Sequence, residues 1–314
     1  MAAAIGYNSR FQLASLAYTK SSTKLLELGY SYTGHANGGN NGQITGITDS
    51  TGTQEAGRTV SYTYDGWARL KTAATTGSST YPAWGLSWSY DRYGNRKQQS
   101  VTAGSGPSSS LNISTTNNRI TDTGYSYDLA GNMTADGLNT LAYDAESRMV
   151  SNVQSGATTT YTLDGSGLRI KKVTSSTTTR YIHSGGKVIA EYENGAAVGS
   201  PTREYIYAGS QLVAGIEGGT TKYYHQDHLS NRVLTNASGG ISEQRGHYPF
   251  GETWFEPGSP SKLKFTSYER DAESGNDYAI FRSHIPRFGR FNQSDPLAGQ
   301  ITDPQSLNRF AYSG

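Results

Sequence analysis

A short unit that begins with Tyr-Asp recurs along the chain and constrains its fold more than any other feature. Its full copies begin at Tyr64-Asp65, at Tyr90-Asp91 with Gly94, at Tyr127-Asp128 with Gly131, and at Tyr143-Asp144, and a degenerate copy spans residues 161–169. The Asp carboxylate can accept hydrogen bonds from N–H groups two residues further on, and Gly tolerates positive φ. Each unit therefore predicts a strand end followed by a tight turn, and its repetition predicts an array of hairpins of unequal length.

The stretches between these units alternate apolar and polar residues with a period of two. Residues 59–64, 86–90 and 187–192 are clear examples, and clusters of Gly, Asn, Asp and Ser separate such stretches. This alternation indicates half-buried β-strands, and no stretch before residue 270 shows helical periodicity. The sequence therefore predicts an all-β fold, in which consecutive antiparallel hairpins form a curved strip.

Composition excludes several classes of protein. The 23 Tyr argue against disorder, and the absence of Cys excludes disulfides, thiolate chemistry and Cys-based zinc sites. The formal net charge of +2 gives no basic footprint for nucleic acid, and no apolar run is long enough to span a membrane. The N-terminus has neither the basic nor the apolar region of a signal peptide.

The Tyr-Asp units, together with an ordered set of motifs after them, carry a resemblance to a known family. These motifs are residues 223–229 (with Asp227 and His228), 248–252, 270–275, Pro286 to Phe291 (with Gly289 and Arg290), Asp295-Pro296, and 307–312. Over essentially its whole length the chain resembles the Rhs (rearrangement hot spot) or YD-repeat proteins, which include the C components of insecticidal toxin complexes and the animal teneurins. A chance match to the whole ordered set is very improbable.

The resemblance implies a repeat sheet that spirals into a hollow shell and a core domain that closes one end. It implies a poorly defined N-terminal edge at 1–24, a YD-repeat shell at 25–219, and a C-terminally truncated Rhs repeat-associated core domain at 220–314. The partner implied is a C-terminal toxin or effector domain, carried as cargo, and further N-terminal repeats or a cap would precede residue 1. No cofactor is implied.

In many members of this family the core domain is an aspartyl autoprotease that cuts the cargo free. The resemblance places one catalytic aspartate at Asp295 and the other at the position of Ile285. Aspartyl proteolysis needs two carboxylates that share a proton, which Ile285 cannot supply. Asp303 or Asp271 would have to replace it, so we expect Asp295 to be vestigial and Asp295-Pro296 to form a turn.

Two other groups of residues invite a functional interpretation. His225, Asp227 and His228 resemble a metal-binding cluster, but residues three apart in a strand point to opposite faces, so we expect no metal site. The recurrent Tyr residues resemble a platform for sugars, but recurrence at one strand position favours cross-strand packing. For Arg290 we expect an anchoring role, with its guanidinium on an acidic group or on backbone carbonyls.

These observations lead to four hypotheses about function. The first is a structural shell and plug segment of a bacterial polymorphic toxin, exported or delivered from the cell surface, that encapsulates an effector used in competition between bacteria. The others are an aspartyl autoprotease, an extracellular adhesion or glycan-binding module, and a gene remnant without function. Because the N-terminal edge strand lacks a neighbour, we also expect a partly open shell with an exposed inner face and self-association through the open edge.

Overall fold

The computed structural model describes residues 1–35, 38–258, 261–297, 299, 300, 302 and 304–312. The described residues form β-strands and three short 3-10 helices, with no α-helix among them, so the predicted all-β fold is confirmed. The 3-10 helices are η1 (Glu55–Arg58), η2 (Phe265–Ser267) and η3 (Pro304–Leu307). No helix in this part of the chain is long and apolar enough to cross a membrane.

The first sheet has nine strands, each paired antiparallel with the next along the chain. They are β1 (Ala2–Tyr7), β2 (Leu13–Lys20), β3 (Thr23–Ser31), β4 (Gly46–Asp49), β5 (Val60–Tyr64), β6 (Leu70–Thr75), β7 (Gly85–Tyr90), β8 (Arg96–Ala103) and β9 (Ser109–Ser110).

The second sheet has thirteen strands and follows the same meander. They are β10 (Tyr125–Tyr127), β11 (Met133–Asp136), β12 (Asn139–Tyr143), β13 (Met149–Gln154), β14 (Ala157–Leu163), β15 (Arg169–Val173), β16 (Thr178–Ser184), β17 (Lys187–Glu193), β18 (Arg203–Ala208), β19 (Gln211–Glu217), β20 (Thr220–Gln226), β21 (Asn231–Thr235) and β22 (Ile241–Gln244).

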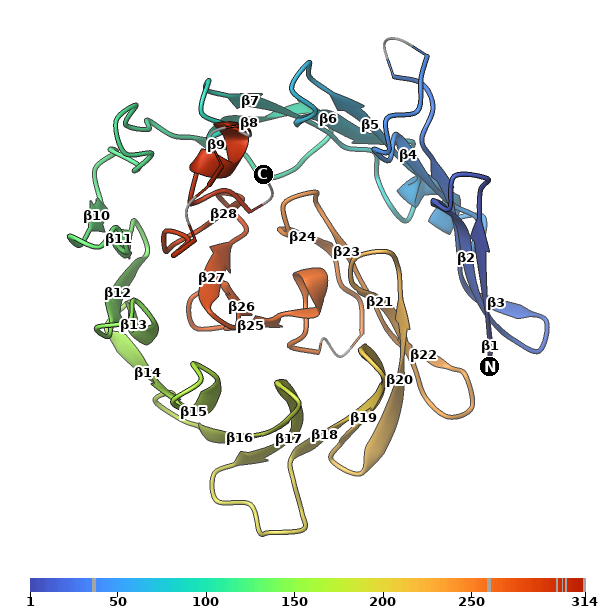
Figure 1. The fold of residues 1–314 in the computed structure, drawn as a ribbon. Helices are drawn as coiled ribbons and strands as arrows, with labels where there is room; N and C mark the ends of the chain where they lie inside the picture. The colour runs from blue at the N-terminus through green and yellow to red at the C-terminus, as the bar shows by residue number, and fades with distance from the viewer. Residues whose placement is uncertain (36–37, 259–260, 298, 301, 303, 313–314) are drawn as a thin grey trace.

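The described part of residues 246–312 forms two small sheets and is called the plug here. Its strands are β23 (Gly246–His247) and β24 (Thr253–Phe255) in one sheet, and β25 (Glu269–Arg270), β26 (Asp277–Ala279), β27 (Arg282–Ile285) and β28 (Arg290–Phe291) in the other. The two large sheets curve into a ring, and the plug lies inside it (Figure 1).

The two ends of the ring meet through side chains and not through strand pairing. Val233 of β21 belongs to one hydrophobic cluster with residues of β2 and β3, including Leu16 and Leu26. The Tyr18 ring lies 4.9 Å from the His225 ring, and Lys20 Nζ donates a hydrogen bond to the carbonyl of Ala237. Strands β1 and β22 belong to different sheets, so the ring is not a closed barrel.

The Tyr-Asp unit forms the predicted turn at each copy. In the copy at Asp144, one carboxylate oxygen accepts the N–H groups of Glu146 and Arg148 at 3.0 and 2.9 Å, and the other accepts Nε of Arg148 at 2.8 Å. Ser147 has a φ of 61°. The pairing register shifts by one residue between Ala142 and Tyr143, which is a β-bulge at the strand end. The hydrogen bond from the amide of the fourth residue after the aspartate recurs at Asp65, Asp91, Asp128 and Asp164.

Neighbouring turns are connected by the tyrosine and by the residue that follows the turn. The Tyr90 hydroxyl donates to the carbonyl of Leu70 at 2.7 Å, and the Tyr143 hydroxyl donates to the carbonyl of Met133 at 2.8 Å. Arg69 donates from Nη1 to the carbonyl of Asp91 at 2.8 Å. These hydrogen bonds connect neighbouring turns in the copies at Tyr90 and Tyr143.

Two further copies of the turn have Asn in place of Asp, which the sequence analysis missed. The Asn8 side chain accepts the amides of Arg10 and Gln12, and Asn236 accepts the amide of Gly240. In the first copy Asn8 Nδ2 donates to Gln12 Oε1, because an amide cannot replace both oxygens of a carboxylate. The pattern Tyr7-Asn8 was the signal available in the sequence.

The structure changes two expectations about the shell. The inner face is covered and not exposed, because the plug packs on it and leaves the Tyr161 and Tyr181 side chains only 4% accessible. Residues 1–24 form β1, β2 and the start of β3, and the second sheet continues past residue 219 to Gln244. The outer edge of β1 has no strand partner among the described residues, so the predicted self-association remains a prediction.

We predict that Asp144→Ala lowers the free energy of unfolding by about 1–2 kcal/mol, because two backbone amides lose their acceptor. Asp144→Asn should cost about half as much, since one amide oxygen remains. The midpoint of urea denaturation measures both effects. The control is Glu146→Ala in the same turn, whose exposed ion pair with Arg148 should contribute less than about 0.5 kcal/mol. Equal losses in Asp144→Ala and Glu146→Ala would contradict the prediction.

Candidate functional site

The contact between the plug and the inner face of the second sheet is a buried charge cluster. The Arg169 guanidinium of β15 donates two parallel hydrogen bonds of 2.8 Å to the Asp271 carboxylate of the plug. Both side chains are almost fully buried, and the guanidinium lies between the rings of Tyr161 and Tyr278, at 4.2 and 3.9 Å from their centroids. This arrangement satisfies the strict geometric needs of a buried ion pair.

Lys172, on the same strand as Arg169, extends the cluster. Its ammonium lies 3.1 Å from Asp271, 3.4 Å from Glu269 and 3.3 Å from Glu273. Burial alone would raise the pKa of Glu269, but Lys262, Lys172 and Arg169 lower it to about 2. The Glu269 carboxylate thus remains ionised, and its ion pair with Lys172 helps to bind the plug to the sheet.

The first sheet holds the plug through aromatic side chains. Trp84 packs edge-on against Tyr248 with ring centroids 4.9 Å apart, and Trp88 packs in the same way against Phe250 at 5.5 Å. Such pairs stabilise beyond the apolar area they bury. The first sheet thus relies mainly on rings, with one ion pair between Arg96 and Glu252 at 3.9 Å, whereas the second sheet relies on the charge cluster.

The segment from Pro286 to Phe291 anchors the plug where the two large sheets meet. Gly289 has a φ of 61°, and a Cβ at this position would approach the Phe250 ring to 2.7 Å. The acceptor for Arg290 is a backbone carbonyl, that of Asn118, at 2.7 Å, and its guanidinium lies 4.6 Å from the Phe310 ring. Burial lowers the pKa of Arg290 to about 10.

Asp295 lies in a pocket of about 340 Å³ that Ala311 and Tyr312 also line. Its carboxylate forms an ion pair with Arg282 at 2.8 Å and accepts the N–H of Leu297, so it does form a turn, with Pro296 exposed at the surface. Asp271 is held in the charge cluster, and Asp303 lies outside the described residues. No second carboxylate is in hydrogen-bond contact with Asp295 in the described chain.

Ile285 lies in an apolar environment. It is fully buried and belongs to a cluster with Leu111, Ile120, Met133 and Phe288. An ionised carboxylate in its place would lose its water without gaining a charged partner from this cluster. The side chains around residue 285 therefore fit an apolar residue.

The histidine cluster is separated, but not by strand alternation, because His225 lies in β20 and His228 lies in the turn after that strand. His225 shares a hydrogen bond with Thr235 Oγ1 at 2.9 Å, while the His228 ring packs against Tyr30. The Asp227 carboxylate accepts the amides of Leu229 and Ser230. The described part of the chain contains no group of three His, Asp or Glu side chains arranged to hold a metal ion.

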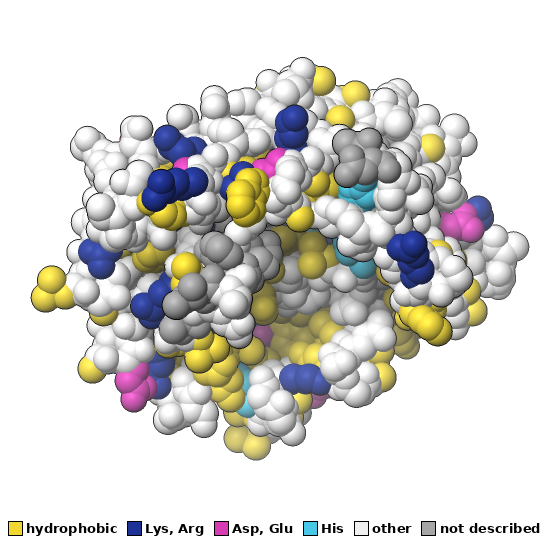
Figure 2. All heavy atoms as spheres, turned by 45° about the horizontal axis from the view of Figure 1, so that its top comes forward, with side chains coloured by type: hydrophobic (Ala, Val, Ile, Leu, Met, Phe, Trp, Pro, Cys, Tyr) yellow, Lys and Arg dark blue, Asp and Glu magenta, His cyan; other side chains and the backbone are white. Residues whose placement is uncertain are grey.

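A cavity of about 580 Å³ lies between the plug and the turns at Tyr64 and Tyr90. Phe310, Ala311 and Tyr312, at the end of the described chain, form part of its wall. Figure 2 shows the hollow in the molecule, which is lined largely by hydrophobic side chains. The described chain ends at this cavity, since Tyr312 lines it.

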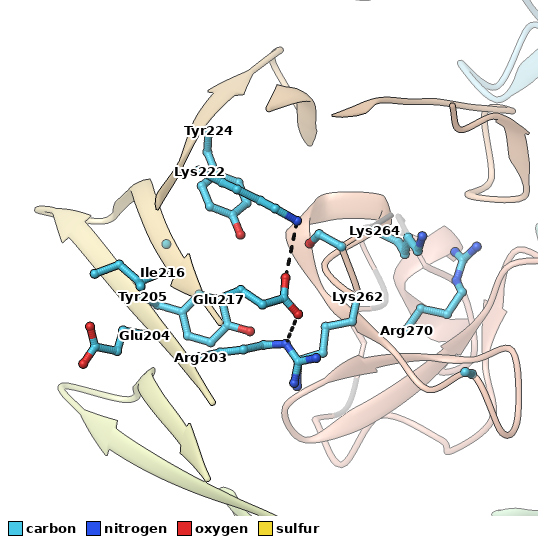
Figure 3. A pocket seen from close by; sticks show the side chains of 13 residues that line it. Arg203, Glu204, Tyr205, Ile216, Glu217, Lys222, Tyr224, Lys262, Lys264 and Arg270 are labelled. Carbon is cyan, nitrogen blue, oxygen red and sulfur yellow. Dashed lines mark hydrogen bonds and ion pairs between the residues drawn. The ribbon is translucent and has the colours of Figure 1, made fainter. Parts of the chain in front are cut away.

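A second pocket, of about 300 Å³, opens between β18–β20 and the plug (Figure 3). Five cationic side chains line it: Arg203, Lys222, Lys262, Lys264 and Arg270. Glu217 lies between Arg203 and Lys222, at 2.8 and 3.4 Å. Arg270 is held by Asp277. Because acidic side chains already pair with these cations, the pocket is a further charged contact between sheet and plug.

Sequence reasoning missed the main charge pair between sheet and plug, although a signal was present. The fifth residue after the turn aspartate points inward and is apolar in the copies with Leu70, Met133 and Met149. In two copies it is Arg96 or Arg169, and both are buried. Arginine at an inward position of a repeat indicates a buried partner, but only the fold identifies it, as Asp271 for Arg169.

The fold and the site together define a shell built from hairpin repeats around an enclosed C-terminal plug. No family model matches the chain. Among curated proteins it is similar to the tRNA nuclease WapA of Bacillus subtilis (strain 168), with 28% identity over 241 residues, which are 72% of this chain and 10% of that protein. It is also similar to the tRNA3(Ser)-specific nuclease WapA of Bacillus spizizenii, with 27% identity over 241 residues and the same coverage.

Solved structures share the fold over nearly the whole chain. The crystal structure of TcdB2-TccC3 aligns with a TM-score of 0.75 at 18% identity, over 98% of this chain and 18% of that chain. The Photorhabdus luminescens Tc holotoxin pore aligns with a TM-score of 0.78 at 17% identity, over 98% of this chain and 17% of that chain. The chain is related to the Rhs or YD-repeat proteins. It spans about a tenth of the length of the curated relatives.

We predict that Asp271→Ala lowers the free energy of unfolding by about 3–5 kcal/mol, because it leaves Arg169 buried without its counterion. The double variant Arg169→Met with Asp271→Leu should recover most of this loss. Guanidinium denaturation measures the three proteins, with Glu273→Ala as the control at the partly exposed end of the cluster. A double variant no more stable than Asp271→Ala would show that the buried charge is not the cause.

We predict that acid destabilises the protein partly through His225. Burial, followed by the charge of the N-terminal amino group, lowers the pKa of His225 from 6.5 to about 4. The unfolded chain then binds more protons than the folded one below pH 6.5, so stability falls as the pH decreases from 6.5 to 4. Relative to wild type, His225→Gln should gain up to about 2 kcal/mol over this range, after solvent screening. Urea midpoints at several pH values measure it, and a constant difference would contradict the assignment.

Proposed function

We propose that this chain is a shell and plug segment of an exported bacterial toxin of the Rhs type, and that it encloses a C-terminal effector. The observation that carries the proposal is the position of the end of the described chain. Phe310, Ala311 and Tyr312 line the internal cavity, so a polypeptide that continues from them starts inside the ring. The names of the curated relatives, tRNA nucleases much longer than this chain, support an effector with a separate activity.

The enclosure would act sterically. The plug occupies much of the ring's interior, and buried charges and aromatic pairs hold it to both large sheets. A shell that is closed at this end keeps an enclosed polypeptide from proteases and from other chains until the wall opens. Delivery from the cell surface in competition between bacteria fits this mechanism.

We further propose that this chain does not cut its own C-terminal extension by aspartyl proteolysis. Asp295 pairs with Arg282, and Ile285 is buried among apolar side chains. A carboxylate neutralised by a guanidinium in this way is a poor proton-sharing partner. Release of the effector would then depend on opening of the shell or on another protease.

A protease-accessibility experiment tests the enclosure. A short cassette with a protease recognition site is fused after Gly314 in one protein and before Met1, which is exposed, in another. We expect the C-terminal cassette to be cut at least about ten times more slowly, because the wall blocks access. Equal cutting rates at the two ends would contradict the enclosure. Incubated without protease, the C-terminally extended chain should also keep its full length on a denaturing gel, and self-cleavage would overturn the proposal on Asp295.

A further inference from the structure

Arg232 of β21 faces a separate internal pocket of about 230 Å³. The pocket lies between the first sheet, β21 and the plug, and Arg58, Tyr62 and His247 also line it. The side chains that surround Arg232 thus come from three parts of the fold. The pocket therefore forms only when the first sheet, β21 and the plug are assembled.

The other charged groups in this pocket have protein partners. Arg58 pairs with Asp49 at 2.8 Å and donates to Gln244 at 2.9 Å. The Asp227 carboxylate accepts two backbone amides of its own turn. Neither carboxylate forms an ion pair with Arg232 in the described chain.

Arg232 differs from these groups. Among the described residues its guanidinium has no ion pair and donates no hydrogen bond, its Nε is buried, and its side-chain neighbour is the Phe255 ring at 5.3 Å. Arg232 is only partly buried, but a guanidinium has five N–H donors, and none of them has an acceptor in the described chain. Donors without an acceptor at the wall of a pocket favour a ligand that can accept from them.

The surroundings of Arg232 favour an anion. Burial, then the charges of Arg270, Arg245, Arg232 and Lys264, lower the pKa of His247 to about 2, so its imidazole stays neutral. His247 Nε2 is buried and has no hydrogen-bond partner in the described chain. The neutral ring can therefore donate a hydrogen bond to an acceptor that the guanidinium holds.

The pocket adjoins the larger cavity at the end of the described chain. Both are lined by Tyr64, Leu70, Leu229, Pro249 and Phe265, and the larger one also by Tyr312. A polypeptide that continues from Tyr312 therefore starts close to the pocket.

We propose that Arg232, with His247 beside it, binds a carboxylate, and that the occupant is an Asp or Glu side chain of the polypeptide enclosed by the shell. The carboxylate would accept two parallel hydrogen bonds from the guanidinium, the geometry that this pair prefers. The identity of the occupant rests on the proposed enclosure. The site would fix one acidic residue of the cargo against the wall of the shell.

Binding is tested with N-acetylglutamate amide as the probe and N-acetylglutamine amide as its uncharged control. We expect calorimetric titration of the whole chain to show binding of the first compound only. Arg232→Gln should raise the Kd by about ten- to a hundred-fold, the value of a charge-assisted pair. The matched control is Arg180→Gln, which removes an exposed arginine of β16 and should leave the Kd unchanged. No difference between the two compounds with the wild-type chain overturns the proposal whether or not Arg232→Gln folds.

A second arm separates this site from the enclosure. The C-terminal cassette described above is made with Glu, or with Gln, at each of several positions after residue 314. If the site holds the cargo, a Glu cassette is cut more slowly than its Gln twin, and Arg232→Gln removes the difference. If the C-terminal cassette is cut slowly whether it carries Glu or Gln, and whether or not Arg232 is present, the enclosure is supported but the proposed occupant of the pocket is wrong. If the chain binds the carboxylate probe but the cassettes at the two termini are cut at equal rates, the carboxylate site is supported and the enclosure is wrong.

Discussion

The hairpins that carry the Tyr-Asp unit depend on the hydrogen bonds that a strand-end aspartate makes to its own turn. One carboxylate oxygen accepts two backbone amides, and the other accepts the side chain of the residue that starts the return strand, as at Asp144. This pairing sets the length of the turn and the position of the bulge. Because a shift of one residue would turn every side chain to the other face, the turn decides which residues face the interior. The tyrosine hydroxyls then connect one turn to the next.

The inner face of such a sheet must be covered, and this protein covers it with its own C-terminal segment. The first sheet supplies indole rings, and the second supplies Arg169 and Lys172. A buried ion pair contributes little net stability compared with apolar packing, but it penalises any arrangement in which its partners separate. The Arg169–Asp271 pair therefore favours one position of the plug against the second sheet. The aromatic contacts add apolar stabilisation.

The interior that remains consists of two adjoining spaces. The larger cavity is lined by aromatic rings together with Arg69, Arg96 and Arg290 and reaches Tyr312, and the smaller pocket presents Arg232. Asp295 and Ile285 lie near the end of the chain without the paired carboxylates that proteolysis needs. These features are consistent with a chamber that holds a polypeptide, with chemistry on the wall that serves binding.

The strands, the turns and their order follow from local sequence, because period-two alternation and the Tyr-Asp unit act within about ten residues. The Asx turns and the all-β fold could be predicted for this reason. The copies at Asn8 and Asn236 were missed because an amide replaces the carboxylate. The predicted exposed inner face was wrong, because no local pattern shows that residues 246–312 return to cover it.

The sequence by itself determined which residues form hairpins and which side chains share a face. Only the tertiary structure decided the partners across the interior, such as Asp271 for Arg169, Arg282 for Asp295 and the carbonyl of Asn118 for Arg290. Those contacts join segments as far as 172 residues apart. They depend on how the whole ring curves, which is the sum of many small strand twists that no single repeat specifies.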